Sequence, residues 1–254
     1  MTPVLGIDIG GSGIKANLVD PETGELKAER LKLPTPDPSL PAAVAEVVGK
    51  MVEHFDYRGA VGCTFPAIVK AGVTLSAANV DKSWIGCRAA DLFAAATGQN
   101  VLVVNDADAA GVAEVAFGAA RGLTGVVVIL TLGTGIGSSI FLDGRLLPNT
   151  EFGHLQFNGY ESVEDWAAAS VKDHEGLTWK QWALRLDAYL KHLDQVLSPN
   201  VIVLGGGVSR RWEKWAHHLT VNVEVVPAAL RNEAGIVGAA VLAARHFQLI
   251  AADR

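Results

Sequence analysis

The sequence predicts an α/β protein built from two related domains. Short apolar segments with strand character alternate with amphipathic helical segments, a pattern typical of α/β folds. A glycine-rich turn between two strands occurs twice, and the strands that follow the turns match at the same offset. Residues 8–12 align with residues 131–135, and residues 15–19 align with residues 138–142. This register, extending beyond the turns, favours a duplication.

The elements follow from residue patterns taken in chain order. Apolar runs between turn signals predict strands at 4–9, 14–19, 61–65, 101–104, 126–130, 138–142, 201–204 and 221–226. Apolar residues at helical spacing predict helices at 41–54, from Asp106 onward, around 182–197 and at 234–246. We expect domains at residues 1–107 and 108–254, with the C-terminal helical segment, 234–248, packing back on the first domain.

The composition is that of a globular protein and limits the partners. The chain has 254 residues, of which 50% are hydrophobic and 19% charged, which excludes disorder. The net charge is −6 and no basic cluster with interleaved aromatic residues occurs, so no nucleic-acid partner is expected. Because no export signal is visible and residues 235–244, the most apolar stretch, are about half a membrane span, we expect a cytoplasmic protein with no membrane partner. Cys63 and Cys87 supply neither a disulfide framework nor a zinc site.

The two glycine turns are candidate phosphate sites. Without Cβ atoms, backbone N–H groups approach a phosphate closely, and hydroxyl side chains add donors. Two ordinary hairpins are the alternative, but the matching register and the acidic Asp8 within an apolar strand favour phosphate binding. Neither turn fits the P-loop or the dinucleotide fingerprint. The candidate donor-binding residues are Asp8, Gly10, Gly11, Ser12, Gly13, Ile14, Lys15, Thr131, Gly133, Thr134 and Gly135.

Polar residues that follow a buried strand are candidates for catalysis. Asn105, Asp106 and Asp108 open a helix, and one of them is enough for an N-cap. Three exceed what capping needs. A carboxylate here can accept a proton from a substrate hydroxyl, and an amide can hold that hydroxyl.

Three further segments are less specific by themselves. Glu151 and His154 can accept and donate hydrogen bonds to sugar hydroxyls, or serve as plain hydrogen-bonding residues. Glu164 alone is an ordinary acidic residue at a helix start. The turn made by Gly205, Gly206 and Gly207 can accommodate a base or ribose, or simply join a strand to a helix. Trp179 and Trp182 are interpreted as core or helix-packing residues.

Together these motifs resemble the repressor–ORF–kinase (ROK) sugar kinases and, among them, the polyphosphate glucokinases. The resemblance covers nearly the whole chain. Residues 8–12 and 132–137 resemble the two phosphate motifs, residues 105–109 the catalytic motif, residues 151–154 the sugar motif and residues 205–207 the adenosine-side turn.

Two departures from the common ROK pattern are typical of the polyphosphate branch. ROK members usually carry a cysteine-rich zinc loop after the sugar-motif histidine, but residues 155–163 contain no cysteine, so no structural zinc is expected. Glu164 then corresponds to the sugar-binding glutamate that follows the loop. Lys15 lies two residues later than the usual lysine, and strand alternation would keep its charge on the same face. Asn79, in a less specific stretch, is a further expected sugar ligand.

The resemblance implies an actin-like ATPase (ribonuclease H-like) fold with the site in an interdomain cleft. It implies phosphoryl transfer from inorganic polyphosphate, with ATP as a further donor, to the C6 hydroxyl of glucose. Asp106 is the expected base, and Asp8 is expected to orient Mg²⁺ through water. The expected sugar ligands are Asn105, Glu151, His154, Glu164 and Asn79. Relatives also suggest a homodimer.

Other functions remain open at this level. An ATP-dependent glucokinase or a glucomannokinase would share these motifs. A sugar-responsive DNA-binding repressor needs a helix-turn-helix before the first phosphate strand, which begins at Val4, and intact Asp106 disfavours a sugar-binding module without activity. A polyphosphate donor requires basic groups leading away from the turns. Candidates, each also explicable as solvated surface, are Lys15, Lys82, Arg88 and Lys172.

Overall fold

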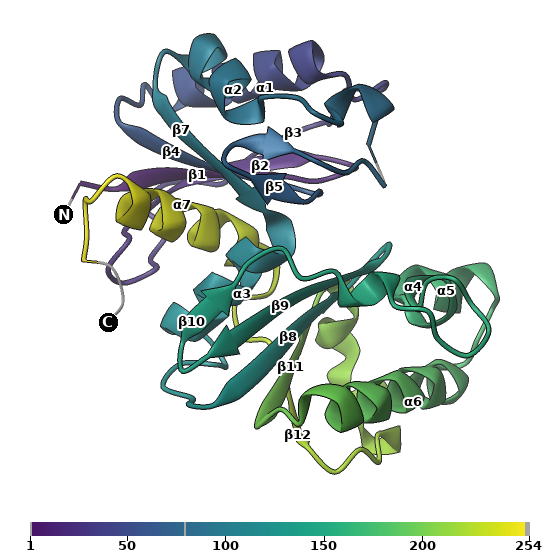
Figure 1. The fold of residues 1–254 in the computed structure, drawn as a ribbon. Coiled ribbons are helices and arrows are strands. Elements are labelled where there is room, and N and C mark those ends of the chain that lie inside the picture. Colours follow the sequence, from purple (N-terminus) through teal and green to yellow (C-terminus); the bar gives the residue numbers. More distant parts are fainter. Residues whose placement is uncertain (1, 79, 252–254) are drawn as a thin grey trace. The chain divides into compact units, whose positions relative to one another are not determined.

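The computed structural model describes residues 2–78 and 80–251. The chain divides into two compact units, one comprising Met1–Ala113 with Glu233–Arg254 and the other Glu114–Asn232. Each unit is built around a five-stranded sheet, which confirms the predicted α/β class (Figure 1). The chain passes from the first unit to the second within helix α3 (Asp106–Phe117).

The first unit carries a sheet with the strand order β3-β2-β1-β4-β7. Strands β1, β4 and β7 are parallel, whereas β2 is antiparallel to its neighbours β1 and β3. The bounds are β1 Val4–Ile9, β2 Ile14–Val19, β3 Leu31–Leu33, β4 Ala60–Phe65 and β7 Asn100–Asn105. All six residues of β4 are buried, as expected for a central strand covered on both faces.

Helices cover both faces of this sheet (Figure 1). Helix α1 (Pro41–His54), with its proline in the first turn, pairs with α2 (Ala89–Thr97) on one face. Helix α7 (Ala234–His246) packs on β1 and β4 from the other. Two glycines allow this close approach: a Cβ on Gly6 would lie 2.1 Å from the Ile236 carbonyl oxygen, and one on Gly62 only 1.9 Å from that of Ala239.

The second unit repeats the same topology, with the strand order β10-β9-β8-β11-β12. The bounds are β8 Val126–Leu132, β9 Ile136–Leu142, β10 Arg145–Leu147, β11 Val201–Gly205 and β12 Glu224–Pro227. As in the first unit, an antiparallel hairpin with a glycine turn is followed by two parallel strands. The predicted duplication is therefore confirmed strand for strand.

Helix α6 (Trp179–Leu197) packs its apolar face into the second unit's core. A capping box formed by Thr178 and Gln181 starts this helix. Its buried face includes Trp182, Leu186, Leu190 and Leu193, as the periodicity predicts. The short helices α4 (Glu164–Ala167) and α5 (Ala169–His174) precede it (Figure 1). None of the described helices combines the length and apolarity that crossing a bilayer requires.

Several boundaries differ from the sequence prediction. The strand expected at 221–226 begins only at Glu224. The C-terminal helix ends at His246, as its helical spacing predicts, two residues before the end of the 234–248 segment that was expected to pack on the first domain. Strands β3 and β10 and helix α2 had not been predicted. The remaining elements are β5 Val69–Lys70, β6 Val73–Thr74, and the 3₁₀ helices η1 Lys82–Trp84, η2 Phe152–His154, η3 Gly207–Lys214, η4 Ala216–His218 and η5 Arg231–Glu233.

Candidate active site

Asp8 lies at the centre of a polar row that crosses three strands of the first unit. Strand pairing places Lys15 on β2 and Thr64 on β4 directly beside it. The Thr64 hydroxyl donates to Asp8 Oδ1 at 2.9 Å, and Lys15 Nζ lies 3.1 Å from Asp8 Oδ2. The α7 residue Gly235 also contacts this carboxylate, because a Cβ there would lie 2.8 Å from Asp8 Oδ1. The structure thus brings the predicted Asp8 and Lys15 together as an ion pair.

The first glycine turn is held by its own backbone and by the following segment. The Gly10 N–H donates to the Gly13 carbonyl oxygen at 3.2 Å, and the Thr35 hydroxyl donates to the Gly10 carbonyl oxygen at 2.5 Å. Gly11 and Ser12 are exposed, whereas Ile14 is buried as the first residue of β2. Backbone N–H groups of an exposed glycine turn suit a phosphate ligand.

Asn105 and Asp106 take different positions at the junction of β7 and α3. Asn105 is buried, its Oδ1 accepts the Asp108 N–H at 3.0 Å, and its Nδ2 donates to the Ala67 carbonyl oxygen at 3.1 Å. Asn105 therefore caps the helix. Asp106 is only partly buried, and its Oδ1 accepts the adjacent Ala107 N–H at 2.9 Å. Because Asn105 supplies the cap, the Asp106 carboxylate is not needed for it.

The second glycine turn is fixed to the start of α5. The Gly133 N–H donates to the Gly135 carbonyl oxygen at 3.0 Å within the turn. Ser170 donates its N–H to the Gly133 carbonyl oxygen at 3.0 Å and its hydroxyl to that of Thr134 at 2.6 Å. Thr131 differs from expectation, since it lies within β8 rather than at the turn.

Of the three predicted sugar ligands of the second unit, Glu151 and Glu164 lie on either side of His154. Its Nδ1 lies 3.8 Å from Glu151 Oε2, and its Nε2 lies 3.4 Å from Glu164 Oε1. Gly153 sets this arrangement, because a Cβ there would lie 2.1 Å from the Ile136 carbonyl oxygen, so only glycine lets η2 pack on β9. The sugar motif is thereby held against the sheet, with Glu151 and His154 on either side of the glycine.

Glu164 links the sugar motif to the second glycine turn. Its Oε2 accepts the Ile136 N–H at 3.0 Å and occupies the position where a Gly135 side chain would begin, 2.3 Å from an ideal Cβ. Burial raises the pKa of Glu151, an effect that nearby His154 opposes and Glu164 reinforces. The carboxylates and the imidazole form one electrostatic cluster that can accept and donate hydrogen bonds.

Gly205, Gly206 and Gly207 form a tight turn from β11 into η3. Gly206 has a φ of 85°, and a Cβ on it would lie 2.1 Å from the Leu132 carbonyl oxygen. This close approach sets the turn beside the end of β8, where the second glycine turn begins. Gly207 lines a cavity of about 410 Å³ together with Gly133 and Thr134.

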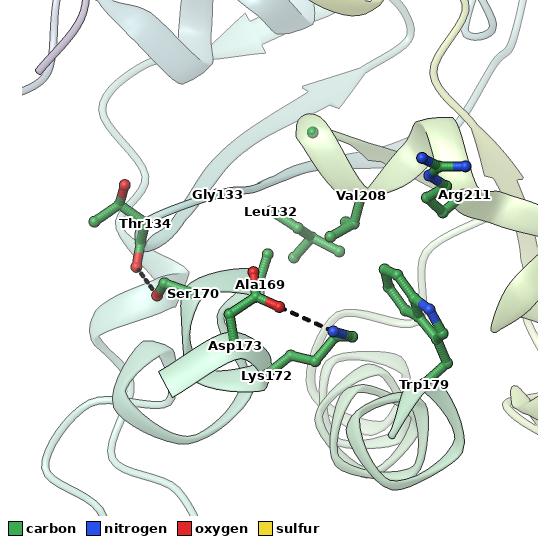
Figure 2. A pocket seen from close by; sticks show the side chains of 11 residues that line it. Leu132, Gly133, Thr134, Ala169, Ser170, Lys172, Asp173, Trp179, Val208 and Arg211 are labelled. Atoms are coloured by element: carbon green, nitrogen blue, oxygen red, sulfur yellow. Dashed lines mark hydrogen bonds and ion pairs between the residues drawn. The ribbon is translucent and has the colours of Figure 1, made fainter. Parts of the chain in front are cut away.

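This cavity lies wholly within the second unit. Its remaining lining residues are Leu132, Ala169, Ser170, Lys172, Asp173, Trp179, Val208 and Arg211. Figure 2 shows Lys172 extended between Asp173 and Trp179: its Nζ lies 2.9 Å from Asp173 Oδ1 and 4.4 Å from the centroid of the Trp179 ring. Trp182 is buried as predicted, whereas Trp179 is partly exposed and lines the cavity. Sequence reasoning missed Arg211 and the cavity role of Trp179.

The other predicted residues are placed as follows. Lys82 Nζ donates to the Ala77 carbonyl oxygen at 2.8 Å, and the exposed Arg88 pairs with Asp91. Neither lines the described cavity. Asn79 lies outside the described residues.

Residues 155–163, where the resemblance leads us to expect no zinc loop, are held by backbone hydrogen bonds and aromatic packing. The Val163 N–H donates to the Leu155 carbonyl oxygen at 2.8 Å, and Phe157 and Tyr160 pair as a β-bridge. The Phe157 ring packs 5.5 Å from that of Trp166. Within the described residues, no group of three or more His, Cys, Asp or Glu side chains is placed to hold a metal ion.

Comparisons with known proteins extend this picture. The polyphosphate glucokinase of Mycobacterium tuberculosis is 49% identical over 237 residues, covering 93% of this chain and 89% of that protein. The crystal structure of the inorganic polyphosphate/ATP-glucomannokinase from Arthrobacter sp. strain KM has 45% identity and a TM-score of 0.93, covering 97% of this chain and 100% of that one. A ROK family glucokinase from Streptomyces griseus, solved with glucose and AMPPNP, has 26% identity and a TM-score of 0.80, covering 96% of this chain and 99% of that one.

These similarities confirm the predicted actin-like fold, which ROK sugar kinases share. The model of the ROK family matches residues 4–171, well over half of the chain. That region includes both glycine turns, the strand-to-helix junction at Asp106 and the sugar motif. The chain belongs to the ROK family.

Proposed function

We propose that this protein transfers the terminal phosphoryl group of inorganic polyphosphate to the C6 hydroxyl of glucose. The observation that carries the proposal is the position of Glu164, whose carboxylate contacts both the sugar-motif His154 and the donor turn at Gly135. Two proposed sugar ligands and a proposed phosphate-binding turn are therefore adjacent within one unit. The polyphosphate glucokinases of mycobacteria, at 49% and 46% identity, support this activity.

The residue roles follow from the chemistry of the side chains. Asp106 accepts the proton of the C6 hydroxyl, and residues of both glycine turns bind the donor phosphates. Carboxylates are weak bases at neutral pH. A weak base suffices here because the phosphoryl-transfer transition state is loose, so that proton removal comes late and positioning dominates. The proposed sugar ligands are Asn105, Glu151, His154, Glu164 and Asn79.

Mg²⁺ fits the environment of Asp8. Magnesium usually keeps several waters and binds through one or two carboxylates plus substrate phosphates, so it needs no cluster of acidic side chains. The Asp8 side chain is 17% exposed and retains lone pairs beyond its contacts with Lys15 and Thr64. We propose that Asp8 orients the ion through water. When bound, the ion neutralises charge on the donor phosphates.

A donor assay tests this function. Purified protein is given glucose with nucleotide-free polyphosphate or with ATP, and glucose 6-phosphate is measured; mannose replaces glucose in parallel, because the Arthrobacter relative is a polyphosphate/ATP-glucomannokinase. We expect product from glucose and polyphosphate. If glucose 6-phosphate forms with ATP but not with polyphosphate, the protein is an ATP-dependent glucokinase instead. Product with neither donor would refute the kinase proposal.

The remaining expectations stay predictions from the sequence. These are a homodimer, a cytoplasmic location, and the absence of nucleic-acid or membrane partners. Size-exclusion chromatography with light scattering measures the first directly.

A further inference from the structure

The cavity of the second unit carries two basic side chains beyond the phosphate turn. At one end lie Gly133 and Thr134 of the second glycine turn, and further along lie Lys172 on α5 and Arg211 on η3 (Figure 2). A chain of phosphates that begins at a glycine turn needs positive charge along its further course. The cavity provides such charge from two different elements.

Lys172 is held in place rather than mobile in solvent. Its side chain is only 16% exposed, whereas that of its partner Asp173 is 78% exposed. Its ammonium group lies over the Trp179 ring, 4.4 Å from the centroid, which is a favourable cation–π position. An ordinary surface ion pair leaves both side chains in solvent. Lys172 is buried because its side chain forms part of the cavity wall.

The same position has a consequence for a nucleotide donor. A flat base gains most when it stacks on an aromatic face. Both Lys172 and Trp179 line the cavity, and the ammonium group of Lys172 lies over the Trp179 ring. The cation is therefore placed to bind a phosphate and at the same time competes with a base for the ring.

We propose that the cavity binds the distal phosphates of the polyphosphate donor and that Lys172 and Arg211 select this donor over ATP. The proposal rests on the proposed function, since it assigns the course of the donor already inferred. Of the four basic candidates in the sequence, it retains Lys172, excludes Lys15, Lys82 and Arg88 as cavity residues, and adds Arg211.

Matched pairs of variants test the assignment. Lys172→Met and Arg211→Met remove a charge from the cavity wall and keep an unbranched side chain. Lys180→Met and Arg210→Met remove the same charges from exposed neighbours that do not line the cavity. Each cavity variant is expected to raise KM for polyphosphate roughly tenfold, as loss of a charge-assisted contact does. The KM for ATP is expected not to rise, and both controls should behave like wild type with either donor.

Salt dependence provides a second readout. Each lost phosphate contact should flatten the rise of the polyphosphate KM with ionic strength. Binding of tripolyphosphate, measured by calorimetry without glucose, should weaken in the two cavity variants only. The inference is wrong if wild-type enzyme uses polyphosphate and the cavity variants match their controls, or if KM rises equally for polyphosphate and ATP. A wild-type enzyme that uses ATP alone would instead refute the proposed function.

Discussion

Replacing Gly135 with alanine should weaken glucose binding although the residue is not one of the proposed sugar ligands. The new methyl group would lie 2.3 Å from Glu164 Oε2, well inside van der Waals contact. Because that atom ends a flexible side chain, the carboxylate moves and the fold is retained. Moving it breaks the 3.0 Å hydrogen bond from the Ile136 N–H and the 3.4 Å contact with His154. A hydrogen bond to a charged group contributes about 1.5 kcal/mol, or roughly tenfold in glucose affinity if the position of Glu164 decides it.

Gly133→Ala is the matched control in the same turn. Apart from its two neighbours in the chain, none of the described residues lies within 4 Å of a Cβ built on Gly133, and its φ lies outside the left-handed region. Glucose dissociation constants of both variants and wild type are measured by calorimetry, and urea unfolding verifies that the variants are folded. Equal glucose affinity in Gly135→Ala and Gly133→Ala would refute the proposed coupling through Glu164.

Three further outcomes are expected. Asp106→Asn should bind glucose and lose about 10²–10⁴-fold in turnover, the usual contribution of a general base; near-wild-type turnover would exclude that role. Elemental analysis of active protein should find substoichiometric zinc, since residues 155–163 are closed by backbone bonds and aromatic packing; stoichiometric zinc whose removal unfolds the protein would contradict this. Burial raises the pKa of Glu151 above its ordinary 4.5, so the stability it contributes at low pH is lost as pH rises through the raised pKa. The free energy of unfolding of Glu151→Gln, measured relative to that of wild type, should therefore increase from pH 4 to neutrality. A difference in unfolding free energy that stays constant with pH would argue against the raised pKa.

Helices and strands were predicted best from the sequence where the spacing of apolar residues and the flanking turn or capping residues indicated the same boundaries. Helix α1 and helix α7 begin and end at the expected residues 41–54 and 234–246, because apolar spacing and flanking residues gave the same answer. Strands β3 and β10 are three-residue edge strands, too short for a period to be visible. Helix α2 is rich in alanine, so its sequence shows little contrast between a buried and an exposed face.

Candidate site residues could be proposed from the sequence where a motif carried them and not where strand pairing created the contact. Asp8, the glycine turns and the sugar motif lie in contiguous segments. The hydrogen bond from Thr64 to Asp8 joins residues of β4 and β1 and depends on parallel register. Arg211 lines the same cavity as Lys172 because η3 and α5 both border the end of β8. Contacts of this kind arise from the tertiary fold, and no local sequence pattern predicts them.

The close packing of α7 on β1 and β4, which Gly6 and Gly62 allow, also constrains the order in which the protein folds during synthesis. The ribosome makes Ala234–His246 after every residue of the second unit. One face of the first unit's sheet therefore stays uncovered until α7 has been synthesised. The second unit, Glu114–Asn232, is a single continuous segment and is complete earlier. A nascent chain paused before residue 234 exposes the apolar face around Gly62, a surface on which chaperones would act.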